Sequence, residues 1–151
     1  MKAIHLICVG KLKDHNLEAI EKDYLKRITN PTLHMHEVKA SAENKMAEAE
    51  AIEKKIKELG ETNLCLVALT EWGKTYNSVE FSGWLDSQIQ NYSKVCIIIA
   101  GAEGFEPTLL SRVNAKISLS NLTFPHKLAR LIAVEQIYRA QTIRSGHPYH
   151  N

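Results

Sequence analysis

The sequence predicts an α/β domain whose mostly parallel sheet is covered by helices on both faces. Five short apolar, β-branched runs recur along the chain, and most intervals between them have helical periodicity. The runs 64–69 and 96–100 are apolar without alternation, which is typical of strands buried on both faces of a parallel sheet. A length of 151 residues fits one domain covering residues 1–151. The expected strands are 3–9, 33–38, 64–69, 94–100 and 116–120.

Three helices have clear signals. The first has one apolar face before Gly60, a residue that favours a left-handed stop, and the second begins with a capping-box pattern at Asn77 and Glu80. The third is expected to start near Pro125, because the fixed φ of proline suits a first helical turn, and to end near Ile143. The apolar face of the first helix consists of Met46, Ala49, Ile52, Ile56 and Leu59, and that of the second of Phe81, Trp84, Leu85 and Ile89.

Composition indicates a compact, water-soluble protein, with 44% apolar and 24% charged residues. The N-terminal apolar run is too short to span a membrane and is not followed by a signal-peptide cleavage pattern, so we expect a cytoplasmic protein without membrane contact. Cys8, Cys65 and Cys96 each lie in an apolar run without CxxC spacing, which predicts buried thiols and no metal site.

Charge is unevenly distributed along the chain. Residues 112–151 contain six Lys or Arg and one acidic residue, Glu135, a formal charge of +5, whereas the remainder carries −3. An anionic partner is therefore expected to contact the C-terminal third.

The ligand site of an open α/β sheet lies beyond the carboxyl ends of the strands. Three loops fall there, at 69–74, 100–105 and 119–126. The second contains Gly101 and Gly104, a spacing that would equally build a tight turn without any ligand. Neither a GxxxxGK[ST] loop nor a GxGxxG after the first strand is present, which disfavours ATP and NAD binding and, with them, a nucleotide-dependent oxidoreductase.

The order of motifs is more specific than any single motif. Along the chain come Val9-Gly-Lys-Leu-Lys13, the GxxG loop, Leu122-Thr-Phe-Pro-His126-x-x-x-Arg130, Glu135-Gln-x-Tyr-Arg-Ala140 and His147-Pro-Tyr-His150. In these motifs the chain resembles, over essentially its full length, the RlmH family of SPOUT enzymes, small bacterial methyltransferases that modify N3 of a pseudouridine in 23S ribosomal RNA. The resemblance implies a C-terminal trefoil knot, a homodimer, S-adenosylmethionine as cofactor and the ribosome as partner.

By this resemblance the cofactor is expected in the loops after strands three to five. The chain departs from the family at Ala100, where glycine is usual, and at Thr70, where an acid is usual. The candidate cofactor-binding residues are Leu69, Ala100, Gly101, Gly104, Leu119, Ser120, Asn121, Leu122, Thr123 and Phe124. His126 is a further candidate for the pocket lining.

The C-terminal tail supplies candidates for the chemistry, because methylation at N3 requires that a proton leave. Tyr149 could contact the target nucleoside, His150 or His147 could act as the base, and Arg139 completes the catalytic set. The resemblance favours docking of this tail beside the pocket of a partner subunit; the alternative is a frayed terminus. Glu135 is expected to form a buried ion pair with an arginine of its own or the partner subunit; the alternative is a catalytic base.

Arg130, Arg139 and Arg144 are the candidate RNA-binding residues, although solvated surface arginines are the commoner case. His34 and His36 are expected at a surface or sheet edge, and Trp72 and Trp84 in the core or an interface. The competing functional hypothesis is a non-catalytic RNA-binding or ribosome-assembly factor on the same fold, supported only by Ala100 and Thr70.

Overall fold

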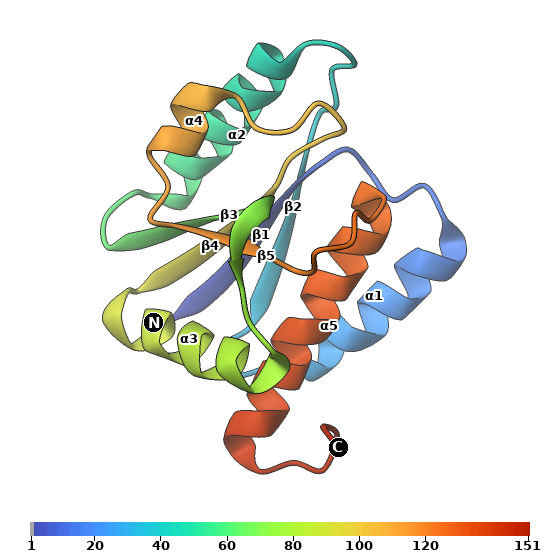
Figure 1. Ribbon diagram of the computed structural model, residues 1–151, viewed down its shortest axis with the longest axis vertical. Coiled ribbons are helices and arrows are strands. Elements are labelled where there is room, and N and C mark those ends of the chain that lie inside the picture. Colours follow the sequence, from blue (N-terminus) through green and yellow to red (C-terminus); the bar gives the residue numbers. More distant parts are fainter. Residues whose placement is uncertain (1) are drawn as a thin grey trace.

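The computed structural model describes residues 2–151 and has strands and helices in strict alternation (Figure 1). This alternation is what the recurring apolar runs predict. The elements are β1 (Ala3–Val9), α1 (His15–Arg27), β2 (Leu33–Val38), α2 (Lys45–Leu59), β3 (Leu64–Thr75), α3 (Ser78–Asn91), β4 (Lys94–Ile99), α4 (Pro107–Ser111), β5 (Ala115–Ser118) and α5 (His126–Ser145).

The five strands form one sheet in the order β2-β1-β4-β3-β5, and every neighbouring pair is parallel. The predicted α/β class is confirmed. Because all strands point the same way, the loops that leave their carboxyl ends meet at one edge of the sheet. That edge carries the three candidate ligand loops: residues 69–74, which lie within β3, and the segments that follow β4 and β5.

Helices cover both faces of the sheet, as expected (Figure 1). Alternate residues of β4 show the division, since successive side chains of a strand point to opposite faces. Ile97 belongs to the core under α1, α3 and α5 and contacts the cluster that contains Ile137, whereas Ile98 belongs to the core under α2 and α4 with Ile52 and Leu109. All five side chains are at most 2% exposed.

The predicted helix signals are confirmed. The Asn77 side chain accepts a hydrogen bond from the Glu80 amide while the Glu80 carboxylate accepts one from the Asn77 amide, each at 2.8 Å, so α3 begins with a capping box. Gly60 ends α2 with φ +86°. Pro125 directly precedes α5, which continues two residues beyond the expected end and stops before Gly146, in the left-handed conformation.

β3 differs from its predicted end at Leu69, because it continues to Thr75. Leu69 and Lys74 both pair with Ile117 of β5, so residues 70–73 bulge out of the strand between them. A Cβ atom on Gly73 would lie 2.5 Å from the backbone of Ile117, so only glycine fits there. The bulge interrupts the apolar run and has no alternating pattern, so periodicity could not reveal that the strand resumes.

The predictions for single side chains have mixed outcomes. Cys8, Cys65 and Cys96 are buried free thiols, as expected, and burial raises their pKa values to about 12, about 11 and about 12. A core position for Trp72 is wrong, since its side chain is 84% exposed on the β3 bulge, whereas Trp84 is half-buried.

His34 and His36 lie on the edge strand β2, as expected. In the part of the chain that the structure describes, no helix is long and apolar enough to cross a membrane. The trefoil knot stays a prediction.

Candidate functional site

A pocket of about 500 Å³ lies at the carboxyl edge of the sheet, where the bulge of β3 meets the loops after β4 and β5. Such a volume is in the range of small-molecule sites. Nine of the ten candidate cofactor residues line it, and the exception is Asn121, which is exposed. The lining residues are Leu69, Thr70, Glu71, Trp72, Ile99, Ala100, Gly101, Ala102, Glu103, Gly104, Phe105, Ser118, Leu119, Ser120, Leu122, Thr123, Phe124, Pro125, His126 and Ala129.

Glycine is required at positions 101 and 104 of the second loop for two different structural reasons. Gly104 has φ +80°, a conformation that other residues rarely adopt, and its amide donates a 3.0 Å hydrogen bond to the Gly101 carbonyl. Gly101 has no positive φ; a Cβ atom there would lie 2.8 Å from Oε1 of Glu48 and 3.1 Å from Cγ1 of Val9. Gly101 is therefore required for close packing behind the pocket wall, a contact that spacing alone could not predict.

Serine hydroxyls shape the third loop. Ser118 Oγ donates a 2.8 Å hydrogen bond to the Ser120 carbonyl, and Ser120 Oγ accepts one of 3.0 Å from the Leu122 amide. These two bonds turn the chain from β5 toward α5 and hold the loop backbone against the pocket. Ser118, which the sequence-based set omits, is buried at the last position of β5.

The pocket is lined by acidic side chains. Glu71 and Glu103 line it, His126 is its other ionisable lining residue, and no Lys or Arg is present in the lining. The hydroxyl oxygen of Thr70 is buried without a hydrogen-bond partner among the described residues, which leaves it available to a ligand. The arrangement fits a ligand with net positive charge and disfavours a polyphosphate.

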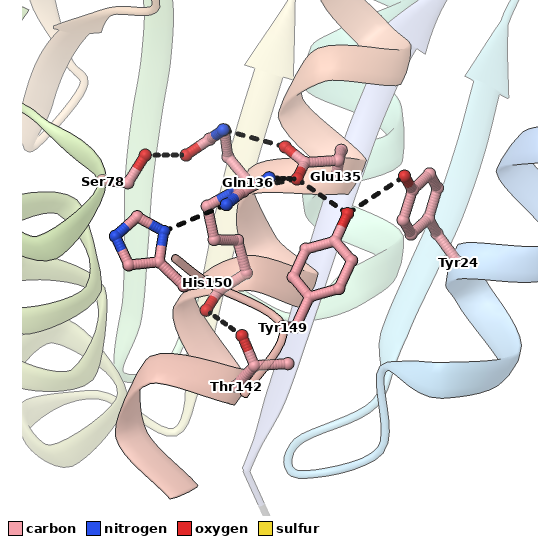
Figure 2. A network of polar contacts seen from close by, with 8 residues as sticks. Tyr24, Ser78, Glu135, Gln136, Thr142, Tyr149 and His150 are labelled. Carbon is pink, nitrogen blue, oxygen red and sulfur yellow. Dashed lines mark hydrogen bonds and ion pairs between the residues drawn. The ribbon is translucent and has the colours of Figure 1, made fainter. Parts of the chain in front are cut away.

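The C-terminal tail forms a second cluster, on α5 (Figure 2). The Tyr149 hydroxyl donates a 3.1 Å hydrogen bond to Oε1 of Glu135 and lies 3.2 Å from the Tyr24 hydroxyl, and its ring packs edge-on against Tyr138 at 4.7 Å. Burial, followed by the contacts with Tyr24 and Glu135, raises the pKa of Tyr149. The tail is docked in its own chain, so the frayed alternative is wrong.

Arg139 connects the parts of this cluster. Its Nε and Nη2 atoms lie 2.9 and 2.7 Å from Oε1 of Glu135, and its Nη1 lies 3.0 Å from Nδ1 of His150. The predicted ion pair of Glu135 with an arginine is confirmed, but it is a partly exposed pair within α5 rather than a buried one. The guanidinium also stacks over the Tyr149 ring at 4.8 Å. Four of the tail and helix candidates are thus held in one defined geometry, whereas Nδ1 of His147 accepts the Tyr149 amide and stays outside the cluster.

The tail cluster and the pocket are separate within one chain. No residue from 146 to 151 lines the pocket. Arg139, which holds His150, lies ten residues after Ala129, the last pocket residue on α5, and this corresponds to about 15 Å along the helix. In this position the tail contributes no residue to the lining of the pocket in its own subunit.

Arg130 requires a correction, because its side chain is buried. It is 7% exposed and pairs with Glu21 of α1 at 2.7 and 2.8 Å and with Glu37 of β2 at 2.6 Å. A guanidinium that is enclosed by two carboxylates has no free face for a phosphate. The prediction that Arg130 binds RNA is therefore wrong, and the residue joins α5 to α1 and β2.

The excess positive charge of the C-terminal third is also smaller in the folded structure than along the sequence, because acidic side chains pair with most of its basic residues. Arg112 pairs with Glu53 and Glu61, and Arg144 pairs with Asp86, all of them acids from earlier in the chain. Within residues 2–151, Lys116 and Lys127 are the basic residues of this segment without an ion pair. The same described part contains no group of three or more His, Cys, Asp or Glu side chains that could hold a metal ion.

Comparisons with known proteins identify the family of the chain. A family model described as a predicted SPOUT methyltransferase matches residues 1–150. Proteins named ribosomal RNA large subunit methyltransferase H are similar to the chain: one from Streptococcus uberis is 36% identical over 97% of this chain and 98% of its own length. Another, from Synechococcus sp., is 39% identical over 97% of this chain and 93% of its own length.

Among solved structures, a probable methylase family protein from Haemophilus influenzae has a TM-score of 0.59 at 11% identity and covers 98% of this chain and 70% of its own. At that identity the likeness shows the fold alone. The full-length match to the family model and the identity to the relatives go further: the chain belongs to the SPOUT methyltransferase family, and within it to the family of the ribosomal RNA large subunit methyltransferases H.

Proposed function

We propose that the protein transfers a methyl group from S-adenosylmethionine to N3 of a pseudouridine in 23S ribosomal RNA. The observation that carries this proposal is the pocket at the carboxyl edge of the sheet, which gathers residues from three separate loops into one acidic cavity of about 500 Å³. The family membership of the chain and the names of its relatives support the reaction and the RNA substrate.

The residues of the pocket fit this cofactor. S-adenosylmethionine carries a sulfonium and an ammonium against one carboxylate, so its net positive charge suits a lining with Glu71 and Glu103 and without Lys or Arg. The adenine would lie among apolar groups such as Leu69, Leu119 and Phe124. The unpartnered Thr70 hydroxyl offers one hydrogen bond at the position where the family usually has an acid.

When bound, the cofactor supplies a methyl group on sulfur that is ready for in-line displacement. The chain has to hold donor and acceptor in line and keep water out. Holding the two in line lowers the entropic part of the activation barrier. The hydrogen-bonded loops around Ser120 and Gly104 provide a rigid cradle for that purpose.

The proposed enzyme is a homodimer in which the tail of one subunit completes the pocket of the other. Two features of the chain support this. The tail cluster lies about 15 Å along α5 from the pocket of its own subunit. Trp72 and Leu122, which line the pocket, are 84% and 71% exposed, and large apolar side chains with this exposure favour coverage by a second copy.

Within the tail, the hydrogen bond from Arg139 defines what His150 can do. Arginine is always a donor, so Nδ1 of His150 must accept, and the ring proton of neutral His150 lies on Nε2. In this state His150 offers the nucleoside an N–H donor rather than a base. Tyr149 donates its single hydroxyl proton to Glu135, so its role is to hold the tail in place beside His150.

The tail would then stabilise the imide anion of the substrate instead of removing its proton. The His150 N–H and the Arg139 cation, placed beside the carbonyl oxygens of pseudouridine, would favour loss of the N3 proton to water, in the way that an oxyanion site stabilises developing charge. Arg139 and the half-exposed Arg144 remain the proposed RNA contacts, and Lys127 adds an unpaired cation at the start of α5.

Titration calorimetry with S-adenosylmethionine on the full-length protein tests the proposal. Saturable binding is expected, and it should persist unchanged in His150→Ala and Tyr149→Phe, which should both lose methylation of ribosomes. Absence of binding at millimolar cofactor would contradict the enzymatic function and favour a non-catalytic RNA-binding or assembly factor.

A further inference from the structure

Glu48 is a buried carboxylate that has no role in the proposed chemistry. It lies in the first turn of α2 and is 6% exposed. Its Oε2 accepts a 2.9 Å hydrogen bond from the Ser41 amide, whereas Oε1 is fully buried and has no hydrogen-bond partner within residues 2–151. A buried oxygen without a partner costs free energy, and such groups concentrate at functional sites.

The carboxylate of Glu48 lies directly behind the wall of the pocket. A Cβ atom on Gly101 would be 2.8 Å from Oε1 and 3.2 Å from Oε2 of Glu48, so this carboxylate packs against Gly101, which lines the cavity. Any larger residue at 101 would push the two apart. The close approach is therefore a built feature of the loop.

The charge of Glu48 is poorly screened compared with the other acids of the site. Glu71 and Glu103 are exposed at the pocket, where water weakens their interactions. Glu48 is enclosed by protein, and none of the ion pairs of the described residues includes it. Because Coulomb interactions are stronger away from water, its field extends into the cavity.

We propose that Glu48 is a specificity-determining residue that makes the pocket prefer a cationic sulfonium over a neutral thioether. This inference rests on the proposed function: the sulfonium is that of S-adenosylmethionine, and the thioether is that of its product, S-adenosylhomocysteine. A negative charge behind Gly101 stabilises the donor before transfer and loses that attraction once the methyl group has left. The same residue therefore favours release of the product.

The test compares the affinities of the two ligands in Glu48→Gln, measured by calorimetry on the full chain. Glutamine keeps the size of the side chain and an oxygen for the Ser41 amide, and removes the charge. Binding of S-adenosylmethionine should weaken about tenfold, which corresponds to about 1.4 kcal/mol. Binding of S-adenosylhomocysteine should change by less than about twofold on the same scale.

Glu50→Gln is the matched control, because Glu50 is exposed on the same helix and its loss changes the net charge equally. It should leave both affinities unchanged. Glu48→Asp keeps the charge and shortens the side chain, so it should preserve the preference for the sulfonium even where both affinities fall.

Equal weakening of both ligands by Glu48→Gln would overturn the inference, since it would assign Glu48 a purely structural role between α2 and Ser41. If circular dichroism shows that Glu48→Gln does not fold, Glu48→Asp is the deciding variant. Loss of the preference for the sulfonium in Glu48→Asp would also overturn the inference. If the unmodified protein binds neither ligand, the proposed function fails together with the inference, whereas binding with an unaltered preference sinks the inference alone.

Discussion

The Arg139 guanidinium donates a hydrogen bond to Nδ1 of His150 at 3.0 Å while it pairs with Glu135 at 2.7 Å. An arginine cannot accept a hydrogen bond, so this contact assigns the proton of neutral His150 to Nε2.

His150 is predicted to act as a donor, so a residue that keeps an amide N–H should replace it in part. His150→Ala should lower the methylation rate roughly a hundredfold, as loss of one charge-stabilising donor does. His150→Gln should retain at least about ten times more activity than the alanine variant, a difference of about 1.4 kcal/mol. Single-turnover rates on ribosomes measure both.

The pH profile separates this role from base catalysis. If the residue at position 150 is only a donor, the rate should rise with pH through the ionisation of the substrate imide, with the same profile in the wild type and in His150→Gln. A wild-type profile with an additional ionisation that the glutamine variant lacks would identify His150 as a base.

Mixed dimers test whether the tail acts on the partner. Gly101→Val should disable the pocket, because its side chain would collide with Glu48 and Val9, and His150→Ala disables the tail. Each variant alone should be inactive. Subunits that are mixed and allowed to exchange should regain activity, because one site of each heterodimer then combines an intact pocket with an intact tail; an inactive mixture of proven heterodimers would place both in one subunit.

Substitutions of Arg130 and of Arg144 should have different effects on the stability of the protein and on RNA binding. Arg130→Leu leaves the carboxylate of Glu21 buried without its cation and should lower the free energy of unfolding by about 3 to 5 kcal/mol. Arg144→Leu removes a half-exposed pair and should cost at most about 1 kcal/mol, but it should reduce the salt dependence of ribosome binding by about one counterion. Urea unfolding and binding at several salt concentrations measure the two effects; an equal stability loss would contradict the assignment.

Acidification should weaken the fold through His5. Burial, followed by the charges of His36, His34 and Lys94, lowers the pKa of His5 to about 4. The unfolded chain therefore binds this proton first, so the stability contributed by neutral His5 is complete above about pH 6.5 and is lost as the pH falls toward about 4.

For this half-exposed ring the loss should be about 1 to 2 kcal/mol, allowing for solvent screening. His5→Gln should show a shallower decline in urea stability between pH 7 and 4.5, while His15→Gln, an exposed control on α1, should follow the wild type. Parallel curves for all three proteins would refute the role of His5.

Much of the fold follows from local patterns. The apolar runs predict all five strands, and Asn77 with Glu80 predicts the start of α3, because these signals depend on neighbouring residues. The return of β3 beyond its bulge depends on the contact of Gly73 with Ile117, 44 residues away, and no local pattern reports it.

The candidate site likewise has a part that the sequence predicts and a part that it does not. The three loops are predictable from their place after apolar strands, and nine of ten candidates line one pocket. The environment of Arg130 is not, because Glu21 and Glu37 come from distant elements and convert an expected phosphate contact into a buried ion pair. Glu48 gives no signal in the sequence, where it is one of several glutamates on an amphipathic helix.

The central claim is methyl transfer to N3 of a pseudouridine in 23S ribosomal RNA. Mass spectrometry of nucleosides from ribosomes incubated with the purified protein and deuterated S-adenosylmethionine tests it most directly. A deuterated methyl group on N3 of one pseudouridine in 23S ribosomal RNA is predicted, and His150→Ala should acquire it at a strongly reduced rate. Ribosomes that lack the modification beforehand and acquire no label, although the protein binds the cofactor, would contradict the claim.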